Sequence, residues 1–137
     1  MPPFHIEKIF NGYRETVADA KKVLDKHALG TAHNKVIHLL SLYEGITISS
    51  LLRKLKVTKQ SLNRVLNDLV EIKAIKFKRD EIDTRVKHVY LTEEGEKIFD
   101  EIFSAQKKRI YDAFLSSESN DVISFDKVLK KIINEKL

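Results

Sequence analysis

One face of the segment from Thr58 to Leu69 is apolar, and its other face carries amide, hydroxyl and basic side chains. The apolar positions have the three- and four-residue spacing of a helix that buries one side: Leu62, Val65, Leu66 and Leu69. The polar face holds Thr58, Lys59, Gln60, Ser61, Asn63, Arg64 and Asn67. Arg pairs with O6 and N7 of guanine, Asn and Gln pair with N6 and N7 of adenine, and groups near a helix N-terminus suit phosphate oxygens. This face therefore predicts a helix that reads duplex DNA, whereas an ordinary solvated face would be richer in Glu and Lys.

A second cluster of basic residues follows in a stretch with a different period. Apolar and basic side chains alternate over residues 75–79, which predicts a half-buried strand. Residues 86–91 are rich in β-branched and aromatic side chains and predict its partner strand, with residues 80–85 as the connecting loop. The resulting hairpin would present basic side chains to a polyanion: Lys78, Arg79, Arg85 and Lys87.

The loop of this hairpin contains an Asp83-Thr84-Arg85 triplet. The Asp83 carboxylate could hold the Arg85 guanidinium through a charge-assisted hydrogen bond. An arginine at a hairpin tip is suited to a narrow, A·T-rich minor groove, where the negative potential is enhanced. We therefore include Asp83 and Arg85 among the expected DNA-binding residues.

The net charge of the chain is +5, and all of the excess lies in its central part. Residues 51–90 contain eleven Lys or Arg and five Asp or Glu, which gives +6 for this segment and −1 for the remainder. A basic segment between nearly neutral ends is the expected footprint of a polyanionic partner such as DNA. The alternative is a solvated surface that is basic without binding a polyanion.

The sequence offers little support for other kinds of chemistry. The chain has no cysteine, which excludes disulfides and thiolate metal sites, and its five histidines do not have the spacing of a zinc-binding helix. There is no nucleophile-elbow or phosphate-loop motif, so we predict neither an enzyme nor a bound cofactor or metal. Apolar runs are far shorter than the ~20 residues that span a bilayer, and residues 1–5 lack signal-peptide features, so we expect a cytoplasmic protein without a membrane partner.

The elements that would position these groups can be predicted from apolar spacing. Helices are expected over about 4–26, from 31 to the glycine at position 45, over 48–55 and over 59–72. The last two are joined by Lys56 and Val57 alone, which is typical of a helix-turn-helix. Two more helices follow the hairpin, one from residue 93 and one after a polar break at 116–121. The predicted fold class is therefore mainly α with a small β-hairpin wing: a winged helix-turn-helix core with additional N- and C-terminal helices.

Threonines stand where several of these helices begin. Their hydroxyl groups can accept hydrogen bonds from the free N–H groups of the first helical turn. The predicted caps are Thr31, Thr47, Thr58 and Thr92. Gly30 is placed to end the first helix in a left-handed conformation, which glycine adopts without steric cost.

The first helix and the last two carry apolar faces that the small helix-turn-helix core cannot cover completely. Exposed apolar surface of this extent usually marks an interface, and many DNA-binding proteins gain affinity by pairing. We therefore predict a homodimer with an interface that includes Ile6, Phe10, Phe103, Phe114, Phe125, Leu129 and Ile132. The alternative is that the three helices pack on one another within one chain.

These features together resemble the MarR family of winged helix-turn-helix transcriptional regulators. Three motifs carry the resemblance: the segment Leu69–Ile75 before the wing strand, the Asp83-Thr84-Arg85 triplet, and Leu91-Thr92-Glu93-Glu94-Gly95 at the start of the next helix. The resemblance covers about residues 5–135. The chain departs from the family in having Lys56 and Lys73 at positions where glycine is usual.

The resemblance implies one domain over residues 1–137, with a DNA-binding lobe at about 31–92 and dimerisation helices at about 4–28 and 93–137. It implies a transcriptional regulator, expected to be a repressor, that binds double-stranded DNA at a palindromic operator as a homodimer. Many relatives respond to a small aromatic or anionic effector. Tyr13, His33 and His38 could line such a pocket here; the alternative, a core or interface position, is the more common role for such residues.

A different class of function also fits a winged helix. The chain could be a protein–protein interaction module that does not bind DNA in a sequence-specific way. Salt dependence discriminates between the two, because DNA binding weakens steeply as salt is added.

Overall fold

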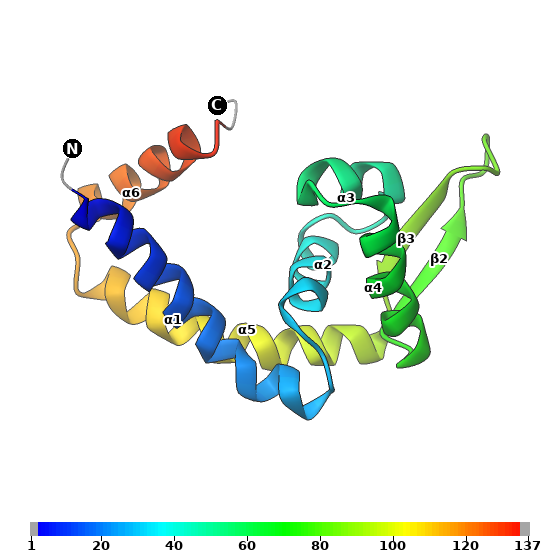
Figure 1. The fold of residues 1–137 in the computed structure, drawn as a ribbon, viewed down its shortest axis with the longest axis horizontal. Helices are drawn as coiled ribbons and strands as arrows, with labels where there is room; N and C mark the ends of the chain where they lie inside the picture. The colour runs from blue at the N-terminus through cyan, green and yellow to red at the C-terminus, as the bar shows by residue number, and fades with distance from the viewer. Residues whose placement is uncertain (1–2, 135–137) are drawn as a thin grey trace.

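The structure is a computed structural model that describes residues 3–134 (Figure 1). Its elements in that range are α1 (Phe4–Lys26), α2 (Thr31–Leu42), β1 (Ile46–Thr47), α3 (Ile48–Leu55), α4 (Lys59–Glu71), β2 (Ile75–Arg79), β3 (Lys87–Leu91), α5 (Glu93–Leu115) and α6 (Ser119–Ile132). In Figure 1, α2, α3, α4 and the wing form one lobe, and α1, α5 and α6 extend away from it. The predicted fold class, mainly α with a winged helix-turn-helix core, is confirmed.

The wing belongs to a three-stranded antiparallel sheet and is not an isolated hairpin. β3 lies in the middle and pairs with β2 from Ile75↔Leu91 to Arg79↔Lys87. It also pairs with β1, through Ile46↔Val89 and Thr47↔His88. The sequence did not predict β1, because two residues are too few to show the period of a strand. This pairing joins the turn before α3 to the base of the wing.

Four predicted boundaries shift slightly in the structure. α2 ends at Leu42, before the glycine at position 45 that was expected to close it. α4 ends at Glu71 and β3 begins at Lys87, each one residue inside its predicted limit. α6 begins at Ser119, so the polar break between α5 and α6 covers only residues 116–118.

The threonines before α3, α4 and α5 cap these helices as predicted. Thr47, Thr58 and Thr92 each accept, through Oγ1, a hydrogen bond from the backbone N–H three residues later, at 3.1, 3.1 and 3.0 Å. The corresponding prediction for α2 was wrong. Gly30 is the N-cap residue of α2, and Thr31 is already helical.

α1 ends in a left-handed residue at Ala28 (φ 55°), and not at Gly30, whose φ is −115°. The Leu29 N–H donates to the Leu24 carbonyl at 2.8 Å, and the Ala28 N–H donates to the Asp25 carbonyl at 3.1 Å. This Schellman pattern turns the chain so that Leu29 enters the core, where it is 8% exposed. Burial of Leu29 thus decides which residue becomes left-handed, against the local preference for glycine.

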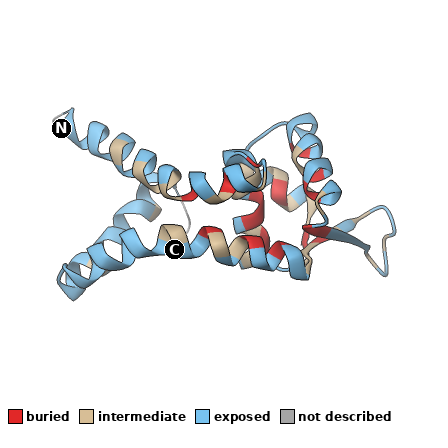
Figure 2. Cartoon of the chain, turned by 90° about the horizontal axis from the view of Figure 1, so that it is seen from below, coloured by how far each residue is buried: buried red, intermediate tan, exposed pale blue. Residues whose placement is uncertain are grey.

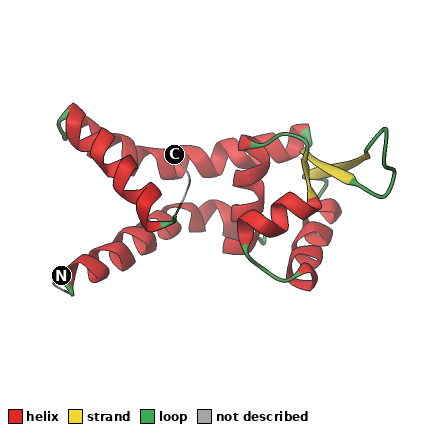
Figure 3. Cartoon of the chain, turned by 90° about the horizontal axis from the view of Figure 1, so that it is seen from above, coloured by secondary structure: helices red, strands yellow, loops and turns green. Residues whose placement is uncertain are grey.

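The core lies in the winged lobe and in the parts of α1 and α5 next to it (Figure 2). Its largest buried side chains include Ile37, Leu40, Leu51, Leu62, Leu69, Ile98 and Ile102. α6 contains no buried residue. Figure 3 shows that the strands are confined to the winged lobe and that the opposite end consists of helices. A single chain therefore has a core at one end only.

No helix among the described residues has both the length and the apolar composition that a membrane span requires.

Two lysines occupy left-handed backbone positions. Lys56, after α3, has φ 54°, and Lys73, after α4, has φ 62°. These are the two positions where the sequence has lysine in place of the family's usual glycine. A left-handed conformation costs a residue with a side chain roughly 1–2 kcal/mol, because its Cβ atom crowds the backbone carbonyl.

Lys73→Gly should raise the free energy of unfolding by about 0.5–1 kcal/mol, which is the left-handed penalty less the extra entropy of an unfolded glycine. Urea denaturation followed by circular dichroism measures this change. Lys76→Gly, in the extended strand β2, is the control and should lower stability by about 0.5–1 kcal/mol. Equal destabilisation by both substitutions would contradict the assigned strain at Lys73.

Candidate nucleic-acid interface

The polar face of α4 is exposed along its length. Lys59, Gln60, Asn63, Arg64 and Asn67 all lie at the surface. Within residues 3–134, none of these five side chains forms an ion pair or a hydrogen bond with another protein group. On the opposite face, Leu62, Leu66 and Leu69 are at most 3% exposed, as the spacing predicted. Burial of this stripe fixes the rotation of the helix and leaves the donors and acceptors of the polar face available to an external partner.

The N-terminus of α4 is closed by two hydroxyl groups. Thr58 Oγ1 accepts from the Ser61 backbone N–H at 3.1 Å and donates to Ser61 Oγ at 2.9 Å. The Ser61 hydroxyl proton therefore remains available for an anion in front of the helix. Such a position suits a phosphate group, because the helix N-terminus carries partial positive charge.

His33 joins the start of α2 to α4. Its Nδ1 atom accepts from the Gly30 backbone N–H at 3.0 Å, and its Nε2 atom lies 2.9 Å from Asp68 Oδ2. Because Nδ1 accepts, Nε2 carries the proton and donates to the Asp68 carboxylate. His33 thus orients α4 relative to α2, and it does not line the cavity beside α5.

The strands of the wing place cations opposite one another. Arg79 is paired with Lys87 across the β2–β3 ladder, and Lys78 is paired with His88. Like charges directly opposite on a sheet destabilise it. Arg79 donates to the Thr84 carbonyl at 3.2 Å, and no carboxylate among the described residues pairs with Lys78, Arg79 or Lys87. The wing therefore concentrates positive charge that an anionic partner would neutralise.

At the tip of the wing, Asp83 holds the side chain of Arg85. Asp83 Oδ1 accepts from Arg85 Nε at 3.1 Å, and Oδ2 accepts from a terminal guanidinium nitrogen at 3.2 Å. The predicted pairing is confirmed. The hydrogen bonds from the Arg85 side chain and backbone lower the pKa of Asp83 below its ordinary value of 3.8, so the carboxylate remains charged. The Arg85 side chain is nevertheless 89% exposed, which leaves it accessible to a partner.

A further network at the base of the tip loop was not predicted. His88 contacts the Gly45 carbonyl oxygen at 2.7 Å through Nδ1 and Asp80 Oδ1 at 2.8 Å through Nε2. The hydrogen bond to Asp80 and that to Gly45 raise the pKa of His88 above 6.5. These partners lie eight and 43 residues away in sequence, so no local motif could have indicated them.

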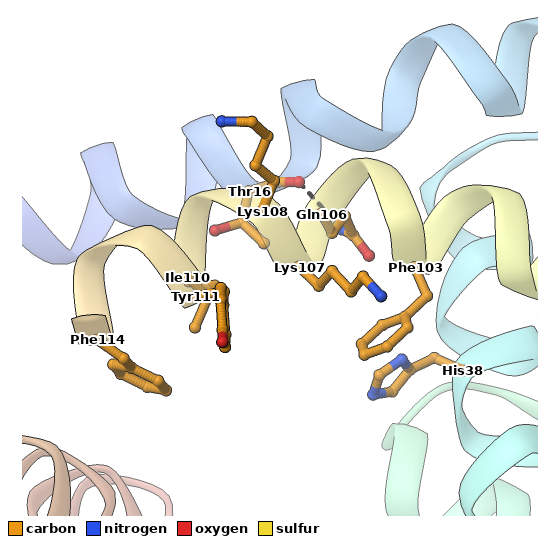
Figure 4. Close-up of a pocket in the computed structure, with 9 residues that line it drawn as sticks. All are labelled: Thr16, His38, Phe103, Gln106, Lys107, Lys108, Ile110, Tyr111 and Phe114. Carbon is orange, nitrogen blue, oxygen red and sulfur yellow. Dashed lines mark hydrogen bonds between the residues drawn. The ribbon is translucent and has the colours of Figure 1, made fainter.

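A cavity lies beside α5, and Figure 4 shows its lining. It has a volume of about 630 Å³ and is lined by Thr16, His38, Phe103, Gln106, Lys107, Lys108, Ile110, Tyr111 and Phe114. Gln106 Nε2 donates to the Thr16 carbonyl at 3.0 Å and joins α5 to α1 at its edge. Tyr13, His33 and His38 were expected to line an effector pocket, and of these three only His38 lines this cavity. Tyr13 lies outside it on α1, with the Lys35 ammonium 5.9 Å from its ring centre.

The apolar residues predicted to form a dimer interface are all exposed in the single chain. Phe10 is 67% exposed, and the others range from 37% to 53%: Ile6, Phe103, Phe114, Phe125, Leu129 and Ile132. They lie on α1, α5 and α6, and Phe103, midway along α5, lines a cavity together with His38 of the winged lobe. Phe114 and Phe125 contact each other edge to face, with ring centres 6.0 Å apart. Packing within one chain therefore covers these faces incompletely.

Comparison with protein families gives a match over the end of α1, the whole winged lobe and the first part of α5. A family model described as "Transcriptional regulator SarA/Rot" matches residues 20–102. The chain is also similar to the HTH-type transcriptional regulator PetP of Rhodobacter capsulatus. The two are 36% identical over 129 residues, which cover 94% of this chain and 78% of PetP.

Solved structures share the fold at lower sequence identity. A MarR transcriptional regulator from Methanosarcina mazei has a TM-score of 0.78 and 23% identity, with 97% of this chain and 96% of that chain covered. NadR in complex with 4-hydroxyphenylacetate has a TM-score of 0.81 and 16% identity, with 94% and 92% covered. A mutant of S. aureus MepR bound to an oligodeoxyribonucleotide has a TM-score of 0.66 and 18% identity, with 98% and 97% covered.

Proposed function

Because the chain belongs to the SarA/Rot family of transcriptional regulators and has a MarR-type winged helix-turn-helix fold, we propose that it binds its operator through α4 and the wing. The observation that carries this assignment is the unneutralised row of cations on the wing, where Arg79 faces Lys87 across the strand pair. These opposed charges destabilise the sheet of the free protein, whereas the phosphates of a duplex would neutralise them.

The residues of α4 and the wing divide into two groups by chemistry. Base edges in the major groove suit the amide and guanidinium groups of Gln60, Asn63, Arg64 and Asn67. Phosphates suit Thr58, Lys59 and Ser61 at the start of α4, and Lys78, Arg79 and Lys87 on the wing. Arg85, held by Asp83, is suited to the adjacent minor groove.

The exposed apolar faces of α1, α5 and α6 support a homodimer. The whole chain would act as one domain, with about residues 31–92 as the DNA-binding lobe and about residues 4–28 and 93–137 as the dimerisation region. A two-fold dimer presents two copies of α4 to one side of the duplex, so its operator would be palindromic. We assign repression, in the cytoplasm and without catalysis, as the mode of action, because a dimer bound to an operator that overlaps a promoter would block access to it.

The cavity beside α5 supports a small aromatic anion as effector. Its walls include the rings of Phe103, Tyr111 and Phe114, and cationic side chains reach its edge. Lys108 is paired with Asp112 at 2.9 Å, whereas Lys107 has no carboxylate partner among the described residues. Lys107 is therefore the cation we assign to an effector carboxylate, with His38 as a neighbouring polar group.

Arg64→Ala should relax base preference at particular positions of the operator, with a cost of about 1–3 kcal/mol on the preferred sequence. Lys78→Ala should instead weaken binding to all sequences alike and reduce the slope of log K against log salt by about one. The operator is first selected from a random DNA pool, and fluorescence anisotropy at several salt concentrations then measures both variants. Equal losses on every sequence would contradict base reading by Arg64, and binding insensitive to salt would favour a protein–protein module.

Ile132→Glu should split the dimer, because it places a charge in an apolar interface, while the winged lobe stays folded. Light scattering should report a monomer, and the affinity for the full palindrome should fall. Ser124→Glu adds the same charge to an exposed polar position of α6 and serves as the control.

The spacing of the operator tests the same dimer. Its two half-sites are expected about 10 bp apart, and inserting about 5 bp between them should abolish tight binding, because one half-site is then rotated to the far side of the duplex. A monomer that binds one half-site as tightly as the palindrome is incompatible with this arrangement.

An aromatic carboxylate should stabilise the protein against thermal unfolding, by about 2.7 kcal/mol at a concentration one hundred times its Kd. The probe is 4-hydroxyphenylacetate, and its neutral amide is the matched ligand. Lys107→Gln should weaken binding of the carboxylate and leave binding of the amide unchanged, whereas Lys108→Gln should change neither. A carboxylate that binds wild type and Lys107→Gln equally well would remove Lys107 from the effector site.

A further inference from the structure

His88 lies on β3 between two hydrogen-bond acceptors, the Gly45 carbonyl oxygen at 2.7 Å and Asp80 Oδ1 at 2.8 Å. Hydrogen bonds from the Asp83 backbone, the His88 side chain and the Ile82 backbone hold the pKa of Asp80 at about 2, so Asp80 has no proton to donate. A neutral imidazole has one N–H group and would turn a lone pair toward one of the two acceptors. Only the imidazolium form, with two N–H groups, satisfies both. The His88 side chain is 26% exposed, so water can replace a lost partner only in part.

From His88, a continuous series of hydrogen bonds leads to Arg85. Asp80 Oδ1 accepts from His88, and Asp80 Oδ2 accepts from the backbone N–H groups of Ile82 and Asp83 at 3.1 and 3.0 Å. The Asp83 carboxylate in turn holds the Arg85 guanidinium. At its other end, His88 is anchored to Gly45, whose N–H donates to the Val89 carbonyl at 3.2 Å. The His88 ring thus joins the Asp80 carboxylate, and the turn that it holds, to the Gly45 carbonyl beside β1, while Arg79 holds the other side of the loop through the Thr84 carbonyl.

We propose that His88 is a positioning residue of the wing: its protonated form holds the tip loop in the shape that presents Arg85, so DNA affinity falls when His88 loses its proton. The inference rests on the proposed role of Arg85 in DNA binding.

The charged groups around His88 set the direction of the effect. Asp80 faces the imidazole and favours the protonated form, whereas Lys78, opposite on β2, disfavours it. Thr47, opposite on β1, is uncharged, and Arg53 on α3 donates to Ser50 Oγ at 2.9 Å. The hydrogen bonds to Asp80 and Gly45 outweigh the effect of burial, so the pKa of His88 is raised above 6.5. The stabilisation of the loop is therefore complete below pH 6.5 and is lost as the pH rises through the raised pKa.

The primary experiment measures DNA affinity by fluorescence anisotropy from about pH 6 to about pH 8.5 at constant ionic strength, the range in which histidine titrates. Wild type should bind about threefold to tenfold more weakly at the upper end, because the loop that presents Arg85 then lacks one hydrogen bond, and a single hydrogen bond typically changes an equilibrium by about this factor. His88→Gln should bind weakly at every pH, because its amide has one nitrogen and cannot donate to both acceptors. His5→Gln, in the exposed first turn of α1, is the control and should keep the wild-type profile.

Two further variants separate positioning from a direct contact with DNA. Asp80→Asn should move the loss of affinity to lower pH, and NMR titration of the histidine rings should show the same decrease in the pKa of His88. Arg85→Ala should weaken binding at about pH 6 and remove the pH dependence, because no tip side chain remains to be positioned.

The outcomes distinguish the inference from the proposed function. A flat pH profile in wild type, or a pH dependence that persists in Arg85→Ala, would overturn the role of His88. An Arg85→Ala variant that binds as tightly as wild type at about pH 6 would instead overturn the role of Arg85 in DNA binding.

Discussion

The close approach of α5 to the base of the wing is the contact on which the rest of the molecule depends. A Cβ atom at Gly95 would lie 2.0 Å from the Ala74 carbonyl oxygen, so only glycine fits. The same carbonyl accepts from the Thr92 N–H at 3.0 Å, and Thr92 Oγ1 donates to the Lys73 carbonyl at 2.6 Å. This junction joins the end of α4, the start of β2, the end of β3 and the start of α5. α4 and the wing are thereby held at fixed positions relative to α5.

The junction has a mechanical consequence for the two ends of the molecule. α5 runs from the wing to the apolar region around α6, and α1 lies against it along much of its length (Figure 1). Polar side chains fasten the two helices: Arg109 donates to both carboxylate oxygens of Asp19, and Lys26 pairs with Glu101 at 3.0 Å. Because the helices are stiff, any arrangement of two chains at the apolar end sets the separation of the two winged lobes. A ligand in the cavity beside α5 would act on the same helix.

The positive charge and the exposed apolar side chains lie in different parts of the chain. The winged lobe holds most of the buried core and also the excess positive charge. The opposite end has exposed aromatic and aliphatic side chains and little core. Neither feature benefits an isolated chain, since opposed cations and exposed apolar area both raise its free energy. The two proposed partners, DNA at one end and a second chain at the other, would remove both costs.

The sequence by itself determined the features that depend on neighbouring residues. Helical and strand periods predicted the elements close to their observed limits, three threonine caps were correct, and the Asp83–Arg85 pair spans only two residues. Tertiary structure decided what depends on distant contacts. Burial of Leu29 moved the left-handed turn to Ala28, strand pairing created β1, and His33 met Asp68 from 35 residues away. The same holds for His88, because its two partners come from different loops and meet only when the sheet and the wing have formed.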